Sequence, residues 1–204
     1  MSTIIAACTC SSIGEDPKVT RQCPEHFHLW RGDRRLASVG SIIRQCWPQG
    51  PMPPADILEN ARDRGSELDK LAAAYVRGEL KKIPAGTRED ARDLFFKFRA
   101  WFDAQNFSKV EVQVVLGGED YGGVLDFRFD GAPCDLKGTY NIEQTAVMQV
   151  SAYTDLCKEE VGGILQVTER LKAPVWRQIT EEDMLDWRIM LSHWRMLQRR
   201  QPPR

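Results

Sequence analysis

The chain has 204 residues, of which 42% are hydrophobic and 28% are charged, as in one globular domain of ordinary size. The formal net charge is -1, so total charge gives no argument for a nucleic-acid partner, although positive groups can still gather on one part of the surface. No apolar run approaches a membrane span and the N-terminus lacks the features of a secretory signal, so we expect a cytoplasmic protein without a membrane partner.

Residues 1–34 differ from the rest of the chain, and we expect them to form an irregular N-terminal arm. Cysteine and histidine are the usual ligands of structural Zn²⁺, which binds four of them in a tetrahedron. Cys8, Cys10, Cys23 and His26 are therefore the candidate ligands of a small zinc-binding element. The Cys-x-Cys spacing is tighter than in the usual zinc knuckle, and reduced thiols in a free arm are the alternative.

Residues 35–204 are predicted to form one α/β (α+β) domain, with a central mixed β-sheet flanked by helices. A short strand or turn and then a helical turn are expected within 35–50. Apolar residues at helical spacing predict a first long helix over about 55–79. Asp69 lies on this helix one turn after Gly65, next to the apolar stripe, and a solvated aspartate is the simplest interpretation of its position.

A second helix is predicted from Thr87 to about Asp103, with Thr87 and Asp90 as an approximate capping box and an aromatic stripe that faces the core. The elements predicted after it are a strand over 109–116, a hairpin over 121–137, a helix over 144–158, a buried strand over 161–168, an edge strand over 174–178 and an amphipathic C-terminal helix over 180–199.

The hairpin over 121–137 carries the residues with the clearest chemistry. Asp130-Gly131 is a strong signal for a two-residue turn, and that turn places Asp126 opposite Asp135. Alternation then puts both aspartates and Lys137 on one face. Like charges opposite each other destabilise a sheet, and a divalent cation would compensate them; the solvated face of a half-buried hairpin is the alternative. The other face is apolar and consists of Leu125, Phe127, Phe129, Ala132, Cys134 and Leu136.

Four short motifs lie on these elements in a fixed order. They are Arg64-Gly-Ser-Glu-Leu-Asp69, Gly123-Val-Leu-Asp126, Asp135-Leu-Lys137 and Gln149-Val-Ser-Ala-Tyr153. With the order helix, helix, strand, hairpin, helix, strand, they resemble the core of the PD-(D/E)XK nuclease superfamily, in particular its RecB-like and phage-exonuclease branch. The resemblance covers roughly residues 36–170 and implies a restriction-endonuclease-like core.

The resemblance implies a metal-dependent DNA nuclease, most specifically an exonuclease of DNA recombination, repair or processing in a bacterial or phage-infected cell. Mg²⁺ or Mn²⁺ would be bound by Asp126, Asp135, the Leu136 carbonyl and, from the long helix, Asp69. Lys137 would orient the attacking water or stabilise the developing charge. DNA is the expected partner, and a homo-oligomer or a recombination or replication protein is a further one.

Gln149 and Tyr153 lie four residues apart on one helix face. With Arg64, they are expected to support the site and to contact the DNA backbone; a polar pair on a partly buried helix is the alternative. Asp69 stands where the branch usually has histidine. No cysteine follows Cys157, so no iron–sulfur cluster is expected. The alternative function is a catalytically inactive nuclease-fold module that binds DNA or protein.

Overall fold

The computed structural model describes residues 20–22, 28–48, 50 and 53–200, and only the backbone of 20–22. All four candidate zinc ligands, Cys8, Cys10, Cys23 and His26, lie outside these residues, so the zinc element stays a prediction. Along the described chain, none of the helices combines the length and apolarity that crossing a membrane requires.

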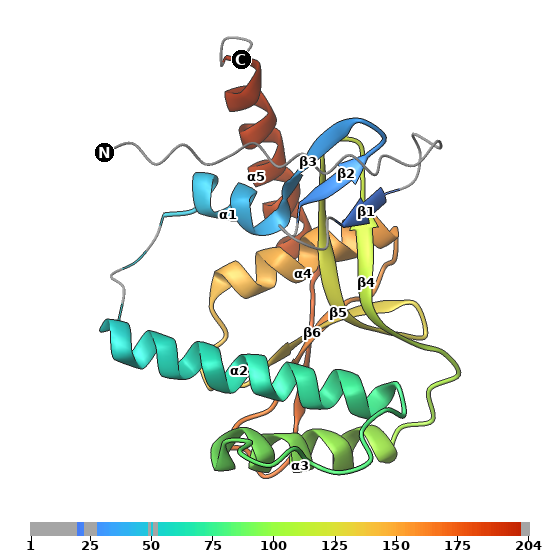
Figure 1. Cartoon of the computed structure of the whole chain (residues 1–204). Helices are drawn as coiled ribbons and strands as arrows, with labels where there is room; N and C mark the ends of the chain where they lie inside the picture. The colour runs from blue at the N-terminus through green and yellow to red at the C-terminus, as the bar shows by residue number, and fades with distance from the viewer. Residues whose placement is uncertain (1–19, 23–27, 49, 51–52, 201–204) are drawn as a thin grey trace.

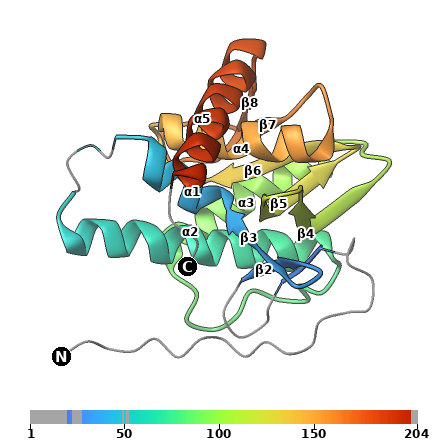
Figure 2. The same ribbon diagram turned by 90° about the horizontal axis from the view of Figure 1, so that it is seen from above.

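One mixed sheet with helices around it forms the described part of the chain, which confirms the predicted α/β class (Figure 1, Figure 2). The strands are β1 (Thr20–Gln22), β2 (Leu29–Arg31), β3 (Arg34–Ser38), β4 (Val110–Gly117), β5 (Tyr121–Phe129), β6 (Ala132–Lys137), β7 (Gly163–Gln166) and β8 (Val175–Gln178). The helices are α1 (Val39–Cys46), α2 (Ala55–Val76), α3 (Glu89–Asp103), α4 (Gln144–Cys157) and α5 (Glu181–Arg199).

Strand β5 is the branch point of the sheet, whose order is β1-β2-β3-β5-β6-β7-β8 with β4 also paired to β5. Strand β4 pairs antiparallel with β5 from Gly122 to Phe129. Strand β3 pairs parallel with only Tyr121 and Gly122, and β6 pairs antiparallel with only Phe127–Phe129. Because Gly122 and Phe127 each have partners on both sides, β3 and β6 must share one edge of β5. The sheet forks there, and residues 123–126 have no partner on that edge.

The hairpin forms in the predicted register at its tip. Asp130 and Gly131 both have positive φ, 47° and 95°, which is the conformation of a type I′ turn and explains the Asp-Gly sequence. The ladder pairs Phe129 with Ala132 and continues to Phe127 and Cys134. It ends there, so the next expected pair, Asp126 with Asp135, is not made.

Two clusters of buried apolar side chains form the core. The α4 cluster joins α1, α4 and α5 to the start of β5, and the α3 cluster joins α2 and α3 to the end of β5 and to β6. We expected one apolar face along the hairpin, and this is wrong: Leu125 packs in the α4 cluster, whereas Phe127 and Phe129 pack in the α3 cluster. The change occurs at Asp126, opposite Gln113, whose φ of 52° lies outside the extended region and breaks the alternation.

Two further expectations need correction, and one helix cap is confirmed. The N-terminal arm is not wholly irregular, because β1 and β2 pair antiparallel and extend the sheet beyond β3. Helix α3 begins after Arg88 without a side-chain cap, since the Thr87 hydroxyl donates to the Pro84 carbonyl instead. Helix α5 has the predicted capping box, in which Thr180 and Asp183 each accept a backbone N–H of the other.

Candidate active site

Asp126 lies where β5 loses its ladder on both sides. It is the one residue of β5 without a ladder partner, because neither Gln113 of β4 nor Asp135 of β6 pairs with it. The Leu136 N–H instead donates to the Asp126 carboxylate at 3.3 Å. The Asp126 side chain therefore replaces the missing backbone acceptor. Its hydrogen bond links β5 to β6 at the point where the two backbones separate.

Asp135 and Lys137 lie on the same face of β6, as the alternation predicts. Asp135 is 1% exposed, and its Oδ2 is 2.8 Å from the Lys137 ammonium. Strand β6 pairs parallel with β7 over 134–137, so both side chains are carried by a strand that is paired along their length. The buried carboxylate thus has a fixed position and a cation beside it.

The three aspartates and Lys137 form one electrostatic cluster. Burial, followed by the charge of Asp135, raises the pKa of Asp69 to about 7, and Lys137 partly opposes this shift. Burial raises the pKa of Asp126 well above its usual range, with further increases from Asp135 and Asp69. Burial alone would lower the pKa of Lys137, but Asp135 and then the other two carboxylates raise it. Asp69, which is half-buried, is therefore coupled electrostatically to this cluster, and whether it binds a metal stays a prediction.

The donor chemistry of the cluster fits a hard divalent cation. Carboxylate and carbonyl oxygens are the ligands that Mg²⁺ takes, and a cation would relieve the repulsion that raises the pKa of Asp69 and Asp126. Among the described residues, however, no three acidic, cysteine or histidine side chains already converge on a position that could hold a metal ion. In this state the Lys137 ammonium compensates Asp135.

Gly123 and Tyr153 are explained by their contact with each other. A Cβ atom at Gly123 would lie 2.8 Å from the Tyr153 hydroxyl oxygen and closer still to the ring, so only glycine fits. Tyr153 is 4% exposed, and burial raises its pKa to about 12. The expected contact of Tyr153 with a DNA backbone is therefore wrong, because its ring is buried against β5, three residues before Asp126. The Gln149 amide donates a long hydrogen bond to the Tyr153 hydroxyl, at 3.4 Å. Unlike Tyr153, Gln149 lines the cleft that is described next.

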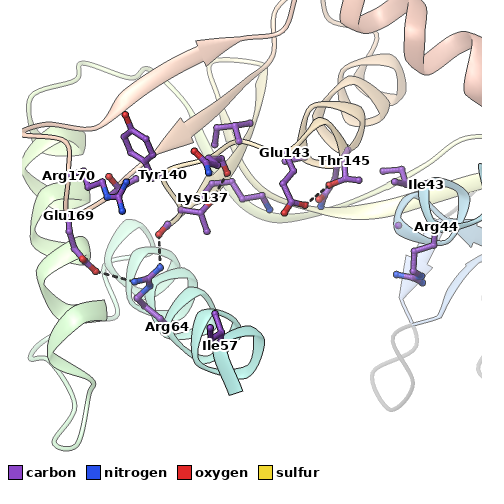
Figure 3. Close-up of a pocket in the computed structure, with 18 residues that line it drawn as sticks. Ile43, Arg44, Ile57, Arg64, Lys137, Tyr140, Glu143, Thr145, Glu169 and Arg170 are labelled. Carbon is purple, nitrogen blue, oxygen red and sulfur yellow. Dashed lines mark hydrogen bonds and ion pairs between the residues drawn. The ribbon is translucent and has the colours of Figure 1, made fainter. Parts of the chain in front are cut away.

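A cleft of about 900 Å³ opens beside Lys137 at the end of β6 (Figure 3). Its walls come from α1, α2, the start of α4 and the segments that follow β6 and β7. Four cationic side chains line it, and two carboxylates accompany them. The cations are Arg44, Arg64, Lys137 and Arg170, and the carboxylates are Glu143 and Glu169. A surface of this composition suits a polyanion with several phosphates.

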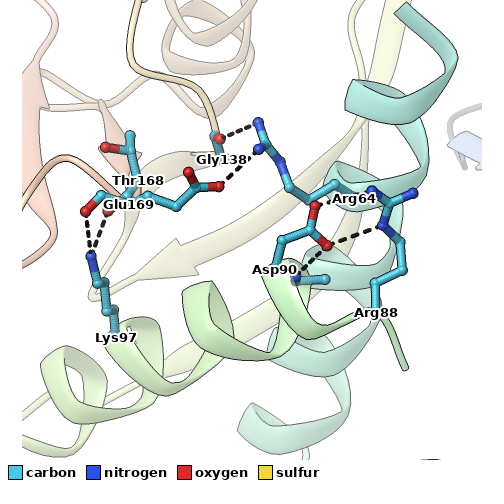
Figure 4. A network of polar contacts seen from close by, with 8 residues as sticks. Arg64, Arg88, Asp90, Lys97, Gly138, Thr168 and Glu169 are labelled. Atoms are coloured by element: carbon cyan, nitrogen blue, oxygen red, sulfur yellow. Dashed lines mark hydrogen bonds and ion pairs between the residues drawn. The ribbon is translucent and has the colours of Figure 1, made fainter. Parts of the chain in front are cut away.

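Two basic side chains fix the wall formed by residues 168–171 (Figure 4). Arg64 donates to the Gly138 carbonyl at 3.2 Å and to Glu169 at 3.0 Å, so it links α2 to the segments that follow β6 and β7. Lys97 of α3 donates to the carbonyls of Thr168, Glu169 and Leu171 at 2.8, 3.1 and 2.7 Å. Arg64 therefore holds the wall of the cleft in place, and its expected roles at the site stay predictions.

The sequence analysis missed Arg44, Arg170, Glu169 and Lys97. The one signal in the sequence was Lys97 itself, a lysine between Phe96 and Phe98 in the aromatic stripe of α3. The other three residues lie in segments whose positions depend on tertiary contacts.

No protein family model and no curated protein sequence matches this chain. Among solved structures, it is similar to an alkaline exonuclease, LHK-Exo, from Laribacter hongkongensis, with a TM-score of 0.41 and 10% identity over 80% of this chain and 92% of that one. It is also similar to SSO0001, with a TM-score of 0.37 and 14% identity over 79% of this chain and 85% of that one.

Proposed function

We propose that this protein is a metal-dependent deoxyribonuclease that hydrolyses phosphodiester bonds, with Asp126, Asp135 and Lys137 as its catalytic residues. One observation supports this above all: the chain breaks the β5 ladder at Asp126 and gathers there the half-buried Asp126, the buried Asp135 carboxylate and the Lys137 ammonium. Such an arrangement costs folding free energy, and a hydrolytic metal site gives it a purpose.

Each residue of the cluster has a distinct role in the proposal. Ionised Asp126 and Asp135, the Leu136 carbonyl and Asp69 would hold Mg²⁺ or Mn²⁺, which when bound lowers the pKa of water and neutralises charge on phosphate oxygens. With a cation at the carboxylates, Asp135 no longer needs the Lys137 ammonium. Lys137, which lines the cleft, then donates hydrogen bonds to the attacking water or to the developing phosphate charge.

The substrate would lie in the cleft with its phosphates along the cationic side chains. Arg44 has no hydrogen-bond or ion-pair partner within the described residues, and Arg170 stacks on the exposed Tyr140 ring at 4.9 Å. These groups can bind a DNA backbone without reading its sequence. Digestion from an end, in recombination, repair or DNA processing in the cytoplasm of a bacterial or phage-infected cell, is the specific activity we propose.

The test is cleavage of end-labelled DNA in the presence of Mg²⁺ or Mn²⁺. We expect products that appear with either ion, vanish with EDTA and are absent for Asp135→Ala. A ladder of single-nucleotide release from the labelled end supports exonucleolytic action, and internal cuts in circular DNA contradict it. Cleavage that survives both EDTA and Asp135→Ala would overturn the nuclease assignment to this cluster.

A catalytically silent nuclease-fold module is the second candidate. The observation in its favour is that no three ligand side chains converge within the described residues, with Asp69 standing where the resembled branch has histidine. This module would bind DNA with a steep salt dependence. Isothermal calorimetry separates the two candidates, because the module takes up DNA but no Mn²⁺, whereas the nuclease binds Mn²⁺ in the absence of DNA.

A further inference from the structure

Helix α5 has two apolar faces, and within the described part of the chain only one of them packs in the core. Its buried face packs against α1 and α4 and consists of Trp187, Met190, Leu191 and Trp194. On another side, Leu185, Ile189 and Met196 are 55%, 59% and 42% exposed. With exposed Ser192 they are spaced by four, three and four residues, so these four side chains form one continuous stripe, the outer stripe. A surface helix normally presents charged or polar residues there.

The two ends of the outer stripe carry opposite charges. Glu181 and Glu182 lie at the start of α5, and Arg199 and Arg200 lie at its end. All four side chains are exposed, and none has a hydrogen bond or ion pair within the described residues. Eighteen residues separate Glu181 from Arg199 and Glu182 from Arg200, and eighteen residues are about five helical turns. Each edge of the stripe therefore begins with an acid and ends with a base.

We propose that the outer stripe binds the same stripe of a second copy of this chain, with the two α5 helices antiparallel. A two-fold axis near the middle of the stripe places Leu185 opposite Met196 of the second copy and Ile189 opposite its Ser192. It also brings the acidic start of each helix to the basic end of the other, on both edges of the stripe. A parallel pairing would instead place acids against acids and bases against bases.

The geometry of α5 leaves room for this pairing. Figure 1 and Figure 2 show α5 at the top of the molecule, and it packs against α1 and α4. The stripe spans twelve residues from Leu185 to Met196, and the distance between its ends is about 17 Å along the helix. A patch of this length buries less surface area than an obligate dimer interface, so we expect a reversible dimer with a dissociation constant in the micromolar range.

Sedimentation equilibrium of the full chain tests the stripe. We expect the mass to rise with concentration from 23.3 kDa toward twice that value. Ile189→Asp places a charge at the centre of the stripe and should weaken association on the order of 100-fold. Phe96→Asp, which changes an exposed apolar residue of α3, is the matched control and should associate like the wild type. Circular dichroism verifies that both variants are folded. Two results would overturn the proposal. One is a mass that stays at the monomer value up to a protein concentration about a hundred times above the expected micromolar range, and the other is association that Ile189→Asp leaves unchanged.

Charge reversal tests the orientation and involves only exposed side chains. The chain with Glu181→Lys and Glu182→Lys has a basic helix surface at both ends, and the chain with Arg199→Glu and Arg200→Glu has an acidic one. Each should be monomeric alone, and the two should form a heterodimer when mixed, with the affinity of the wild type or better at low salt. Homodimers of either variant with wild-type affinity, or no heterodimer on mixing, contradict the antiparallel arrangement.

Discussion

The central hairpin has a tip, where Phe127–Phe129 pair with residues 132–134, and a base, which carries Asp126, Asp135 and Lys137. Both belong to one continuous alternating sequence, yet they differ in strand pairing and in the side chains that they bring together. At the tip, three consecutive pairs join β5 to β6, and Phe129 stacks on Phe107 with ring centroids 4.5 Å apart. At the base, Asp126 has no ladder partner, and the carboxylates of half-buried Asp126 and buried Asp135 lie there in place of aromatic rings. Aromatic packing at the tip stabilises the fold, whereas repulsion between the carboxylates at the base destabilises it.

The comparison indicates where the fold and the proposed chemistry separate. Removing a side chain at the tip should cost stability and leave the chemistry of folded molecules intact. Removing a carboxylate at the base should abolish the chemistry and leave stability unchanged or improved, since a like charge is lost, whereas removing Lys137 leaves Asp135 without its cation. Each experiment below tests one side of this division.

The largest effect should come from Lys137→Ala at the base. Among the described residues the Lys137 ammonium is the only cation in contact with Asp135, and we expect cleavage to fall by about 10³-fold or more. Calorimetric Mn²⁺ binding should be largely retained, because the carboxylates remain. Lys109→Ala is the matched control, since Lys109 lies next to the tip and should leave the rate unchanged. If Mn²⁺ binding is lost together with cleavage, the proposed role of the lysine is wrong.

Phe129→Ala should have the opposite signature at the tip. Phe129 is buried and contacts three aromatic side chains besides Phe107, which are Trp101, Phe102 and Phe127. Its truncation should therefore lower the free energy of unfolding by about 3–5 kcal/mol. Urea denaturation measures this loss. Cleavage per folded molecule should match the wild type at a temperature where the variant is folded. A stable but inactive Phe129→Ala protein would refute the division of the hairpin.

Gly123→Ala should affect both properties, because Gly123 packs against the buried Tyr153 ring and lies three residues before Asp126 on β5. The added methyl group collides with the Tyr153 ring, which should cost about 1–3 kcal/mol and shift Asp126. In a Tyr153→Leu background the same substitution should cost clearly less, and thermal unfolding of the four proteins gives the coupling. Equal costs in the two backgrounds would show that the ring does not select the glycine.

The smallest effect should be a pH dependence of stability at Asp69. Its pKa in the folded protein is raised to about 7, so the folded state binds this proton more tightly than the unfolded state. The resulting stability is complete below the unfolded pKa, about 4, and is lost as the pH rises through 7. Between pH 5 and 8, the Tm of the wild type should fall by a few degrees relative to Asp69→Asn. Adding Mn²⁺ should restore stability at pH 8 and have little effect at pH 5. Parallel pH profiles would contradict the raised pKa of Asp69.

The sequence predicted the features that depend on local spacing. The Asp130-Gly131 turn, the register at the tip and the capping box of α5 follow from neighbours in the chain. The ladder break at Asp126 was not predictable, because it depends on a positive φ at Gln113, a residue type that seldom adopts one. The alternation of the hairpin therefore predicted the face of Asp135 and Lys137 and failed for Leu125.

The cleft was missed for a related reason. Its walls meet because β3 pairs with the start of β5, and nothing local in residues 34–38 indicates that distant partner. Tyr153 was expected to contact DNA because it belongs to the Gln149-x-x-x-Tyr153 motif, and the motif does not reveal that its ring is buried. Its contact with Gly123 explains why both residues occur in the chain without any ligand.

The attachment of β3 has a consequence for the motions of the protein. Only two residue pairs and the Ala37 N–H bond to the Asp120 carbonyl at 3.0 Å join β3 to β5, whereas β4 is joined to β5 along nearly its whole length. Native-state hydrogen exchange should therefore detect a partial opening in which the Ala37 amide exchanges well before those of β5 at the tip. Because α1 follows β3 directly, that opening would widen the cleft on the side of Arg44. A duplex end could enter through this fluctuation while the strands that carry the carboxylates stay closed.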